Sequence, residues 1–131
     1  MGESFDPGAV GRAFSEHRFD EVFAHLARDV RWTVVGYMVL EGADAVMRTC
    51  RETRESLKGT TTSRDRCVTA VDDGVVAVDS VDRYRGPDGV TAVARCNVLE
   101  FVDTKITSIT SYAVEVDPHC AGAPPARGGL R

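Results

Sequence analysis

The sequence has neither a long apolar run nor a cluster of basic residues. No hydrophobic stretch approaches the roughly 20 residues of a membrane-spanning helix, and the N-terminus lacks the pattern of a secretory signal. The net charge is −4, and the arginines alternate with acids. This distribution argues against binding to nucleic acid or to an acidic membrane surface. We therefore expect a cytoplasmic protein with no nucleic-acid partner and no membrane partner.

Cysteine and the motifs of metal and phosphate sites are also scarce. The four cysteines, Cys50, Cys67, Cys96 and Cys120, lie far apart, with no C-x-x-C pair and no histidine at metal-ligand spacing. The first three fall in predicted helices or strands, where a buried thiol packs like a small hydrophobic group. There is no glycine-rich phosphate loop and no nucleophile elbow. We expect no metal, no cofactor and no disulfide.

The first half of the chain has helical patterns. With 131 residues, 43% of them hydrophobic, the chain fits one domain with a core of its own. Asp6 followed by Pro7 is typical of a helix start. The apolar spacing predicts a helix over residues 6–16 and another over 42–57. Between them, a helix is predicted to begin at residue 20, with an apolar stripe of Val22, Phe23, Leu26 and Val30. A strand is predicted over residues 30–35.

The second half has the texture of β-structure. Strand-like segments cover residues 60–71, 75–85, 90–102 and 105–116, separated by short turn signals rich in Asp and Gly. Consecutive hairpins predict an antiparallel meander, and helices that precede it predict the α+β class. We expect one domain over residues 1–116. Residues 117–131, rich in Pro, Gly and Ala, are expected to form a disordered tail.

Three segments resemble the nuclear transport factor two-like superfamily, which includes ketosteroid isomerases, SnoaL-type polyketide cyclases and limonene epoxide hydrolases. Asp29–Trp32 with Glu41–Val46 looks like the family's strand, loop and G-x-x-A-I helix start. Ser80–Tyr84 resembles the R-x-D strand of the epoxide hydrolases, and Asn97–Ile106 resembles the D-V-x-x-F-x-D-G-K-I hairpin. The resemblance covers residues 6–117. It implies a cone-shaped α+β roll, with three N-terminal helices on a curved, mainly antiparallel sheet that encloses a pocket for a small hydrophobic ligand.

The sequence departs from the known active sites of the families it resembles. The sequence is similar to the limonene epoxide hydrolases at Asp82. However, it has Ser80 at the position of their arginine and Ser111 at the position of their second acid. Where ketosteroid isomerases have their base, this sequence has Thr33. Where they have the helix tyrosine and the oxyanion acid, it has Phe14 and Asn97, respectively. Asn97 alone keeps a related role, as a neutral hydrogen-bond donor.

Strand register predicts which polar side chains meet. The glycine-flanked turn pairs Ser80 with Arg95, and a three-residue turn at 102–104 would pair Arg95 with Ser111. Arg95 would then lie between the two serines and within diagonal reach of Asp82. A one-residue slip would move these side chains to the other face.

These patterns lead to a set of candidate site residues. Asp82, Arg95 and Asn97 are the catalytic candidates, with Asp82 as the proton acceptor because an apolar pocket favours proton transfer to a carboxylate. The alternative is a purely structural ion pair between Asp82 and Arg95. The substrate-binding candidates are Trp32, Tyr37, Ser80 and Ser111, while His17 and His25 are expected to be solvated or capping residues.

We expect a cofactor-free acid–base enzyme of the isomerase or cyclase type. Two alternatives remain open, a limonene-type epoxide hydrolase and a non-catalytic ligand-binding or dimerisation domain. Epoxide hydrolysis should be weak, since a serine at position 111 cannot act as the acid. An apolar stripe of Ala94, Cys96, Val98 and Val102 on the strand face opposite the pocket predicts a homodimer.

Overall fold

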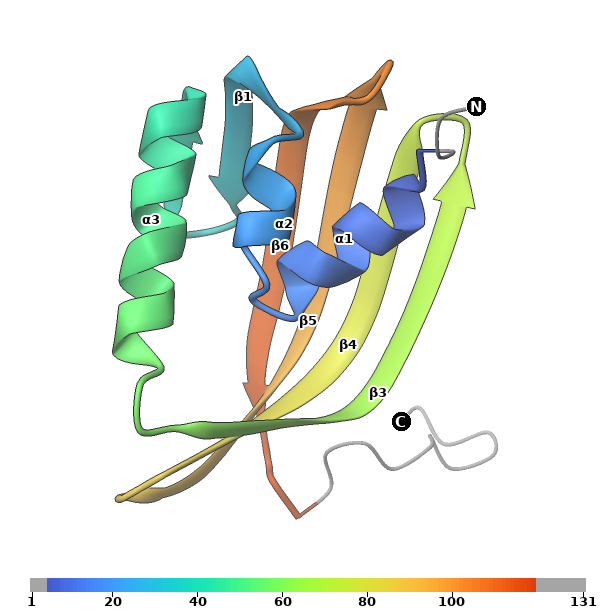
Figure 1. The fold of residues 1–131 in the computed structure, drawn as a ribbon. Helices are drawn as coiled ribbons and strands as arrows, with labels where there is room; N and C mark the ends of the chain where they lie inside the picture. Colours follow the sequence, from blue (N-terminus) through green and yellow to red (C-terminus); the bar gives the residue numbers. More distant parts are fainter. Residues whose placement is uncertain (1–4, 120–131) are drawn as a thin grey trace.

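The structure, a computed structural model, describes residues 5–119, and over these residues three helices lie on one face of a curved six-stranded sheet (Figure 1). The sheet order is β2-β1-β6-β5-β4-β3. Every neighbouring pair is antiparallel except β1 and β6, which are parallel. The elements are α1 (Pro7–Ser15), α2 (Asp20–Phe23), β1 (Leu26–Val34), β2 (Met38–Glu41), α3 (Ala43–Ser56), β3 (Thr61–Asp72), β4 (Val75–Gly86), β5 (Gly89–Val102) and β6 (Lys105–Val116).

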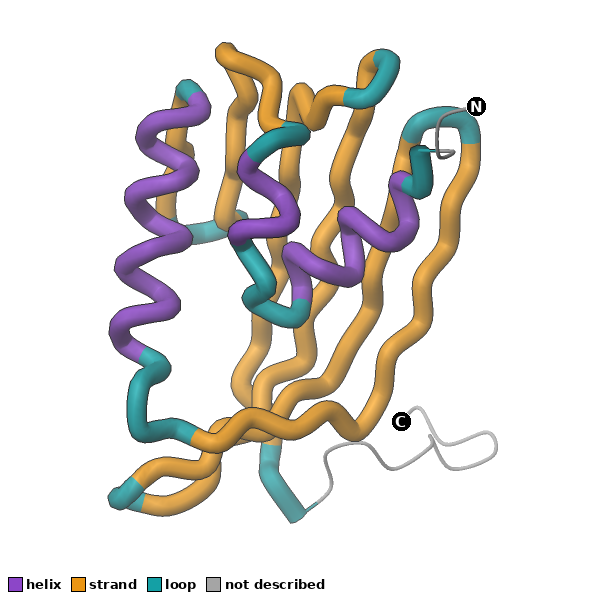
Figure 2. The backbone as a smooth tube through the Cα atoms, viewed as in Figure 1, coloured by secondary structure: helices purple, strands orange, loops and turns teal. Residues whose placement is uncertain are grey.

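The predicted α+β class and the four-strand meander are confirmed. The long strands β3 to β6 form consecutive hairpins, and the helices cover the concave side of the sheet (Figure 2). The first hairpin closes through Asp73 and Gly74, with φ angles of 44° and 81°. Two central residues with positive φ match the right-handed twist of the flanking strands. The Asp-Gly signal therefore specified the turn.

The second helix was predicted too long. It ends at Phe23, and Leu26 and Val30 belong to β1. A spacing of four residues fits one face of a helix, but an even spacing also fits one face of a strand. Leu26, Val30 and Trp32 are all buried on the inner face of β1, so the strand pattern prevails. The short strand β2 was not predicted, because its residues are mostly exposed.

Helix α1 begins as predicted and packs closely on β4. The Asp6 Oδ1 atom accepts a hydrogen bond from the Ala9 amide at 3.1 Å. A Cβ atom at Gly11 would lie 2.6 Å from Cγ1 of Val76, so only glycine allows this approach. The end of α1 is thereby held against the sheet, where it contributes Ser15, Glu16 and His17 to the site described below.

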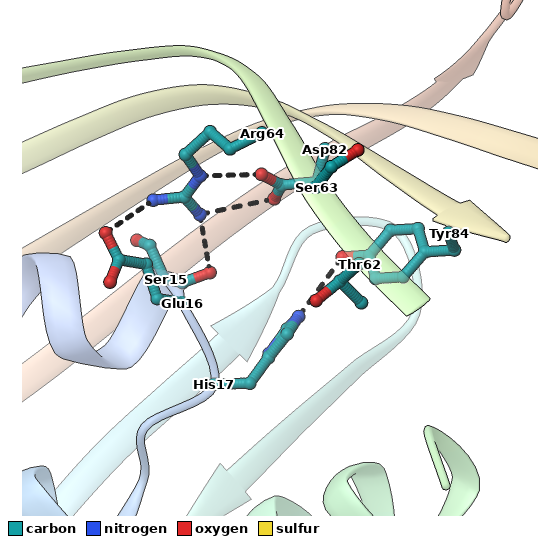
Figure 3. A pocket seen from close by; sticks show the side chains of 8 residues that line it. All are labelled: Ser15, Glu16, His17, Thr62, Ser63, Arg64, Asp82 and Tyr84. Atoms are coloured by element: carbon teal, nitrogen blue, oxygen red, sulfur yellow. Dashed lines mark hydrogen bonds and ion pairs between the residues drawn. The ribbon is translucent and has the colours of Figure 1, made fainter. Parts of the chain in front are cut away.

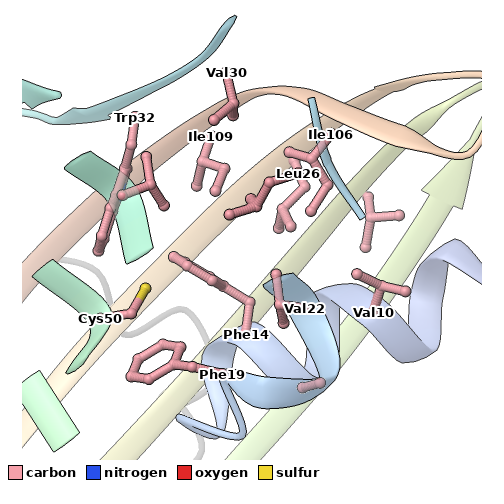
Figure 4. Close-up of a cluster of buried hydrophobic side chains, with 14 of the residues drawn as sticks. Val10, Phe14, Phe19, Val22, Leu26, Val30, Trp32, Cys50, Ile106 and Ile109 are labelled. Atoms are coloured by element: carbon pink, nitrogen blue, oxygen red, sulfur yellow. The ribbon is translucent and has the colours of Figure 1, made fainter. Parts of the chain in front are cut away.

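The core lies between the helices and the inner face of the sheet (Figure 4). Burial of apolar side chains here is the main stabilising contribution to the fold. The aromatic rings of Phe14 and Trp32 meet edge to face, with centroids 5.1 Å apart. The largest fully buried aliphatic residues are Val22, Val30, Val46, Val76, Val78, Leu99, Ile106 and Ile109.

The cysteines divide between buried and exposed positions. Cys50 packs in the core as predicted, and burial raises the pKa of its thiol to about 12. The prediction was wrong for Cys67, which is exposed on the edge strand β3. Cys96 is half-buried on the outer face, and Cys120 lies outside the described residues.

The outer face of the sheet carries the predicted apolar stripe. Ala94, Cys96 and Val98 are half-buried, and Val102 is 61% exposed. Most of the predicted disordered tail, residues 120–131, lies outside the described residues, and the domain boundary at residue 116 stays a prediction. No described helix is both long and apolar enough to cross a membrane.

Candidate functional site

The register of β4 on β5 agrees with the prediction, whereas that of β5 on β6 does not. Ser80 pairs with Arg95, but Arg95 pairs with Ala113, and Ser111 lies opposite Asn97. The turn after Val102 contains two residues, and a register shift follows between Glu100 and Phe101. A two-residue turn in a regular hairpin would direct the Ser111 side chain to the outer face. The register shift, a β-bulge, directs it to the inner face instead.

Asp82 lies on the inner face of β4 and is 4% exposed. Its Oδ1 accepts a hydrogen bond from Nε of Arg64 at 2.7 Å (Figure 3). Its Oδ2 lies 3.4 Å from Nη2 of Arg64, 3.4 Å from Nη1 of Arg95 and 3.3 Å from the Ser80 hydroxyl. Two guanidinium groups thus share one buried carboxylate. Such pairing offsets the cost of burying these charges.

Arg64 is a site residue that the sequence analysis missed. Besides Asp82, it donates to the backbone oxygen of Ser15 at 2.8 Å and pairs with Glu16 at 3.2 Å. A regular hairpin closed by Asp73 and Gly74 would place Asp65, not Arg64, opposite Asp82. A register shift between Arg64 and Arg66 brings Arg64 inwards instead. The sequence gives no clear signal for that bulge.

His17 follows the end of α1 and, against expectation, faces the site. Its Nε2 lies 3.1 Å from the Tyr84 hydroxyl, which accepts a hydrogen bond from Nη1 of Arg95 at 2.7 Å. Its backbone has a φ of 62°, a conformation that turns the chain back toward the sheet. Burial, and next the charge of Arg95, lowers the pKa of His17 to about 4, although Asp82 opposes this shift. The imidazole is therefore neutral at physiological pH.

A buried chain of hydrogen bonds runs beside this cluster. The Trp32 indole N–H donates to Ser111 Oγ at 2.9 Å, and Ser111 Oγ donates to Asn97 Oδ1 at 2.6 Å. Asn97 Nδ2 in turn donates to Ser15 Oγ at 3.0 Å. These bonds link β1, β6, β5 and the end of α1. They also fix the orientation of the Asn97 amide, with its nitrogen toward α1.

Two adjoining hollows contain these groups. The first, called the apolar cavity, has a volume of about 220 Å³ and is lined mainly by aromatic and aliphatic side chains. Its lining residues are Phe14, His17, Phe19, Trp32, Val34, Met38, Thr49, Thr53, Arg95, Asn97, Ser111 and Ala113. The second, called the polar pocket, has a volume of about 160 Å³ and is lined by Ser15, Glu16, His17, Thr62, Ser63, Arg64, Asp82 and Tyr84. His17 lines both.

The predicted site residues divide between these hollows. Arg95, Asn97, Trp32 and Ser111 line the apolar cavity, and Asp82 lines the polar pocket. Ser80 is fully buried beneath Asp82. Tyr37 is 82% exposed in the turn between β1 and β2 and lines neither hollow.

The arrangement is suited to binding a small molecule with an apolar body and a polar end. Arg95 and Asn97, which carry hydrogen-bond donors, line the same cavity as the neutral imidazole of His17. Such groups can hold a substrate oxygen and exchange a proton with a neighbouring atom. Within residues 5–119, no group of three or more His, Cys, Asp or Glu side chains is placed to hold a metal ion.

Comparisons with known proteins agree with this architecture. The structure is similar to an NTF2-like protein of unknown function from Cytophaga hutchinsonii, with a TM-score of 0.73 and 22% identity over 85% of this chain and 100% of that one. It is also similar to an LEH-like epoxide hydrolase from M. tuberculosis, with a TM-score of 0.60 and 22% identity over 81% of this chain and 77% of that one. A candidate polyketide cyclase from Xanthomonas campestris gives a TM-score of 0.63 and 19% identity, over 79% and 84% of the two chains.

At these identities the solved structures bear on the fold alone. Among curated proteins, no sequence matches the chain. The profile of the SnoaL-like domain family matches residues 9–109. The chain therefore belongs to the SnoaL-like domain family, within the nuclear transport factor two-like superfamily.

Proposed function

We propose that this protein binds a small hydrophobic molecule in the apolar cavity and moves a proton on it without a cofactor, as an isomerase or cyclase. The observation that carries the proposal is the composition of the cavity wall. The apolar hollow of about 220 Å³ has Arg95, Asn97 and His17 among its few polar lining residues. Apolar pockets with a few convergent polar groups are typical of small-molecule sites.

Asn97 is the group that holds the substrate oxygen in this proposal. One of its two amide N–H groups donates to Ser15, and its carbonyl oxygen accepts from Ser111. The second N–H has no partner within the described residues. A fixed donor of this kind stabilises the negative charge that develops on a carbonyl oxygen when a neighbouring carbon loses a proton.

His17 is the group that takes the proton. It is neutral, and it lines the apolar cavity as well as the polar pocket. A base with a pKa of about 4 to 5 can remove a proton next to a carbonyl when the resulting enolate is stabilised. The negative charge of Asp82 favours the imidazolium that forms, while Arg95 and Arg64 oppose it.

Asp82, the base predicted from the sequence, has a supporting role in this proposal. Its two oxygens contact Arg64, Arg95 and Ser80, and it lines the polar pocket behind His17. Both carboxylate oxygens are thus already engaged as acceptors. Asp82 therefore orients Arg95 and balances part of its charge. Direct proton transfer to Asp82 remains the competing assignment.

Solvent deuterium exchange tests the function without knowledge of the natural substrate. Small cyclic ketones and enones would be incubated with the protein in D₂O, and exchange of the protons next to the carbonyl followed by NMR. We expect accelerated exchange, reduced about 10²- to 10⁴-fold in His17→Gln, the usual loss on removal of one acid–base group. Full exchange in His17→Gln with none in folded Asp82→Asn would make Asp82 the base. No acceleration by the wild-type protein would favour a non-catalytic binding domain.

Limonene-type epoxide hydrolysis fits the site less well. That reaction, as the resemblance implies, needs a second acid where Ser111 lies. The Ser111 hydroxyl already donates to Asn97 and accepts from Trp32. Among the described residues, no Asp or Glu lines the apolar cavity. Incubation with limonene epoxide should therefore yield no rapid diol formation.

We also propose that the protein forms a homodimer through the outer face of the sheet. Val68, Tyr112 and Val114 are between 47% and 63% exposed on this face, next to the stripe of half-buried residues on β5. Exposed apolar groups of this extent are typical of interaction surfaces. The cytoplasmic location stays a prediction from the sequence.

A further inference from the structure

The charge on the wall of the apolar cavity has one sign. Among the described residues that line it, Arg95 is the only one that carries a charge at neutral pH. The others are apolar or neutral, and the lowered pKa of His17 keeps its imidazole uncharged. A ligand in this cavity therefore meets a cation and no anion.

The charge of Arg95 is only partly balanced by its neighbours. Its Nη1 lies 3.4 Å from Asp82, but the same carboxylate bonds to Arg64 at 2.7 Å. Two guanidinium groups therefore share one buried anion. Glu16 adds a second negative charge, but it is an exposed residue that pairs with Arg64 and does not line the apolar cavity. An uncompensated positive charge remains at Arg95.

The hydrogen-bonding groups on this wall also favour an anionic ligand, because they include free donors. Arginine has five N–H donors, and the contacts of Arg95 with Tyr84 and Asp82 both use Nη1. Within residues 5–119, Nε and Nη2 of Arg95 have no partner. The acceptors of two neighbouring side chains are already engaged, since Asn97 Oδ1 accepts from Ser111 and Ser111 Oγ accepts from Trp32. The wall offers free donors to a ligand.

We infer that the substrate of this protein carries a carboxylate, or a comparable oxygen anion, which binds to Arg95 in the apolar cavity. Arg95 is thus a specificity-determining residue, whereas Asn97 holds the reacting oxygen. This inference rests on the proposed function, which makes the cavity the substrate site. A planar guanidinium with adjacent free donors is well matched to the two oxygens of a carboxylate.

The cavity also limits the size of the substrate. An apolar cavity of about 150 Å³ is known to hold one benzene molecule, and this cavity measures about 220 Å³. The aromatic side chains Phe14, Phe19 and Trp32 line its body. The cavity therefore has room for a hydrophobic acid whose apolar part is a single ring or a similarly compact group.

Intrinsic fluorescence provides a direct test, because Trp32 is the only tryptophan of the chain and lines the cavity. Cyclohexanecarboxylate and cyclohexanecarboxamide have the same ring and nearly the same shape, and differ in charge at pH 7. Each would be titrated into the wild-type protein at low ionic strength. We expect the carboxylate to bind at least about tenfold more tightly, as charge-assisted hydrogen bonds are stronger than neutral ones.

Two variants locate the charge responsible. Arg95→Met keeps the aliphatic stem and should abolish the preference for the carboxylate. Asp82 retains Arg64 and Ser80 in this variant, so no anion is left buried alone. Arg66→Met is the matched control, because Arg66 pairs with Asp79 on the outer face and is half exposed. This control should keep the preference.

The outcomes separate this inference from the function on which it rests. Equal binding of the amide and the carboxylate to the wild-type protein would overturn the inference and leave the proposed function standing. A preference that survives in Arg95→Met would also overturn it. If neither compound binds at millimolar concentration, the ligand cavity and the proposed function fail together.

Discussion

At the scale of single residues, the position of His17 shows how burial sets the chemistry of the site. An imidazole on an exposed helix end would titrate near its ordinary pKa of 6.5. Here the chain turns at His17 itself and places the ring against Tyr84, between the two hollows. The cluster around it contains Arg95 on β5, Asp82 on β4 and Arg64 on β3. Burial and the two cations lower the pKa of His17, whereas the anion Asp82 opposes them.

This environment predicts a dependence of stability on pH. The pKa of His17 is about 4 in the folded protein and about 6.5 when unfolded, so the unfolded chain binds the proton more tightly. The free energy of unfolding should therefore fall as the pH drops from about 6.5 to about 4, by at most about 3 kcal/mol from this residue. Below pH 4 the contribution is constant. Chemical denaturation at a series of pH values measures it.

Comparison of variants isolates this contribution from that of the carboxylates. His17→Gln should flatten the slope between pH 4 and 6.5. His25→Gln is the control, since His25 packs on Phe5 away from the charge cluster and should keep the slope. An unchanged slope in His17→Gln would mean that His17 is not the buried neutral group described above.

At the scale of elements, strand β4 carries cross-strand ion pairs that differ in burial. Asp82 faces the interior, with 6% of its side chain exposed, and pairs with Arg64 on β3. Asp79 faces outwards, with 51% of its side chain exposed, and pairs with Arg66, which also lies on β3. Exposed pairs contribute little to stability, whereas removing one partner of a buried pair is costly.

The two aspartates are therefore predicted to differ in their effect on stability. Asp82→Asn should lower the free energy of unfolding by about 3 kcal/mol, because two partly buried guanidinium groups lose their anion. Asp79→Asn should lower it by less than about 1 kcal/mol. Urea denaturation measures both. Similar losses for the two variants would contradict the view that Asp82 holds the arginines in place.

The same elements explain how far the site could be predicted. The turn signals and the alternation of side chains placed Asp82, Arg95 and Asn97 on one face of the sheet, and the structure agrees. Arg64 and the true partner of Ser111 were missed because each depends on a bulge. A bulge changes the register by one residue and has no compact sequence signature. His17 was missed because its burial depends on how α1 docks on the sheet.

The fold itself was easier to predict than the site. Four long strands and two of the three helices have strong local patterns, which depend on the spacing of apolar residues. The errors fall where two patterns compete, as at Leu26 and Val30, or where the pattern is weak, as in β2. Long-range pairing, such as that of β1 with β6, leaves no local trace in the sequence.

At the scale of the whole molecule, the outer face of the sheet predicts self-association. The wild-type protein should sediment as a dimer at micromolar concentration. Tyr112→Asp, on the outer face and 50% exposed, should shift it to the monomer. Tyr37→Asp is the matched control, because Tyr37 is 82% exposed but lies in the β1–β2 turn. A wild-type protein that sediments as a monomer would exclude this interface.

The parallel pairing of β1 with β6 also has a consequence for synthesis of the chain. Trp32 lies beside Ile109, so an early strand has its main partner in the last one. During translation the N-terminal helices and β1 leave the ribosome long before β6 is made. Until then, their apolar surfaces have no complete sheet to pack against. The cavity wall that joins Trp32 to Ser111 can close only after translation of β6. Contacts between such distant segments slow folding, so the nascent chain should depend on chaperones until its final strand emerges.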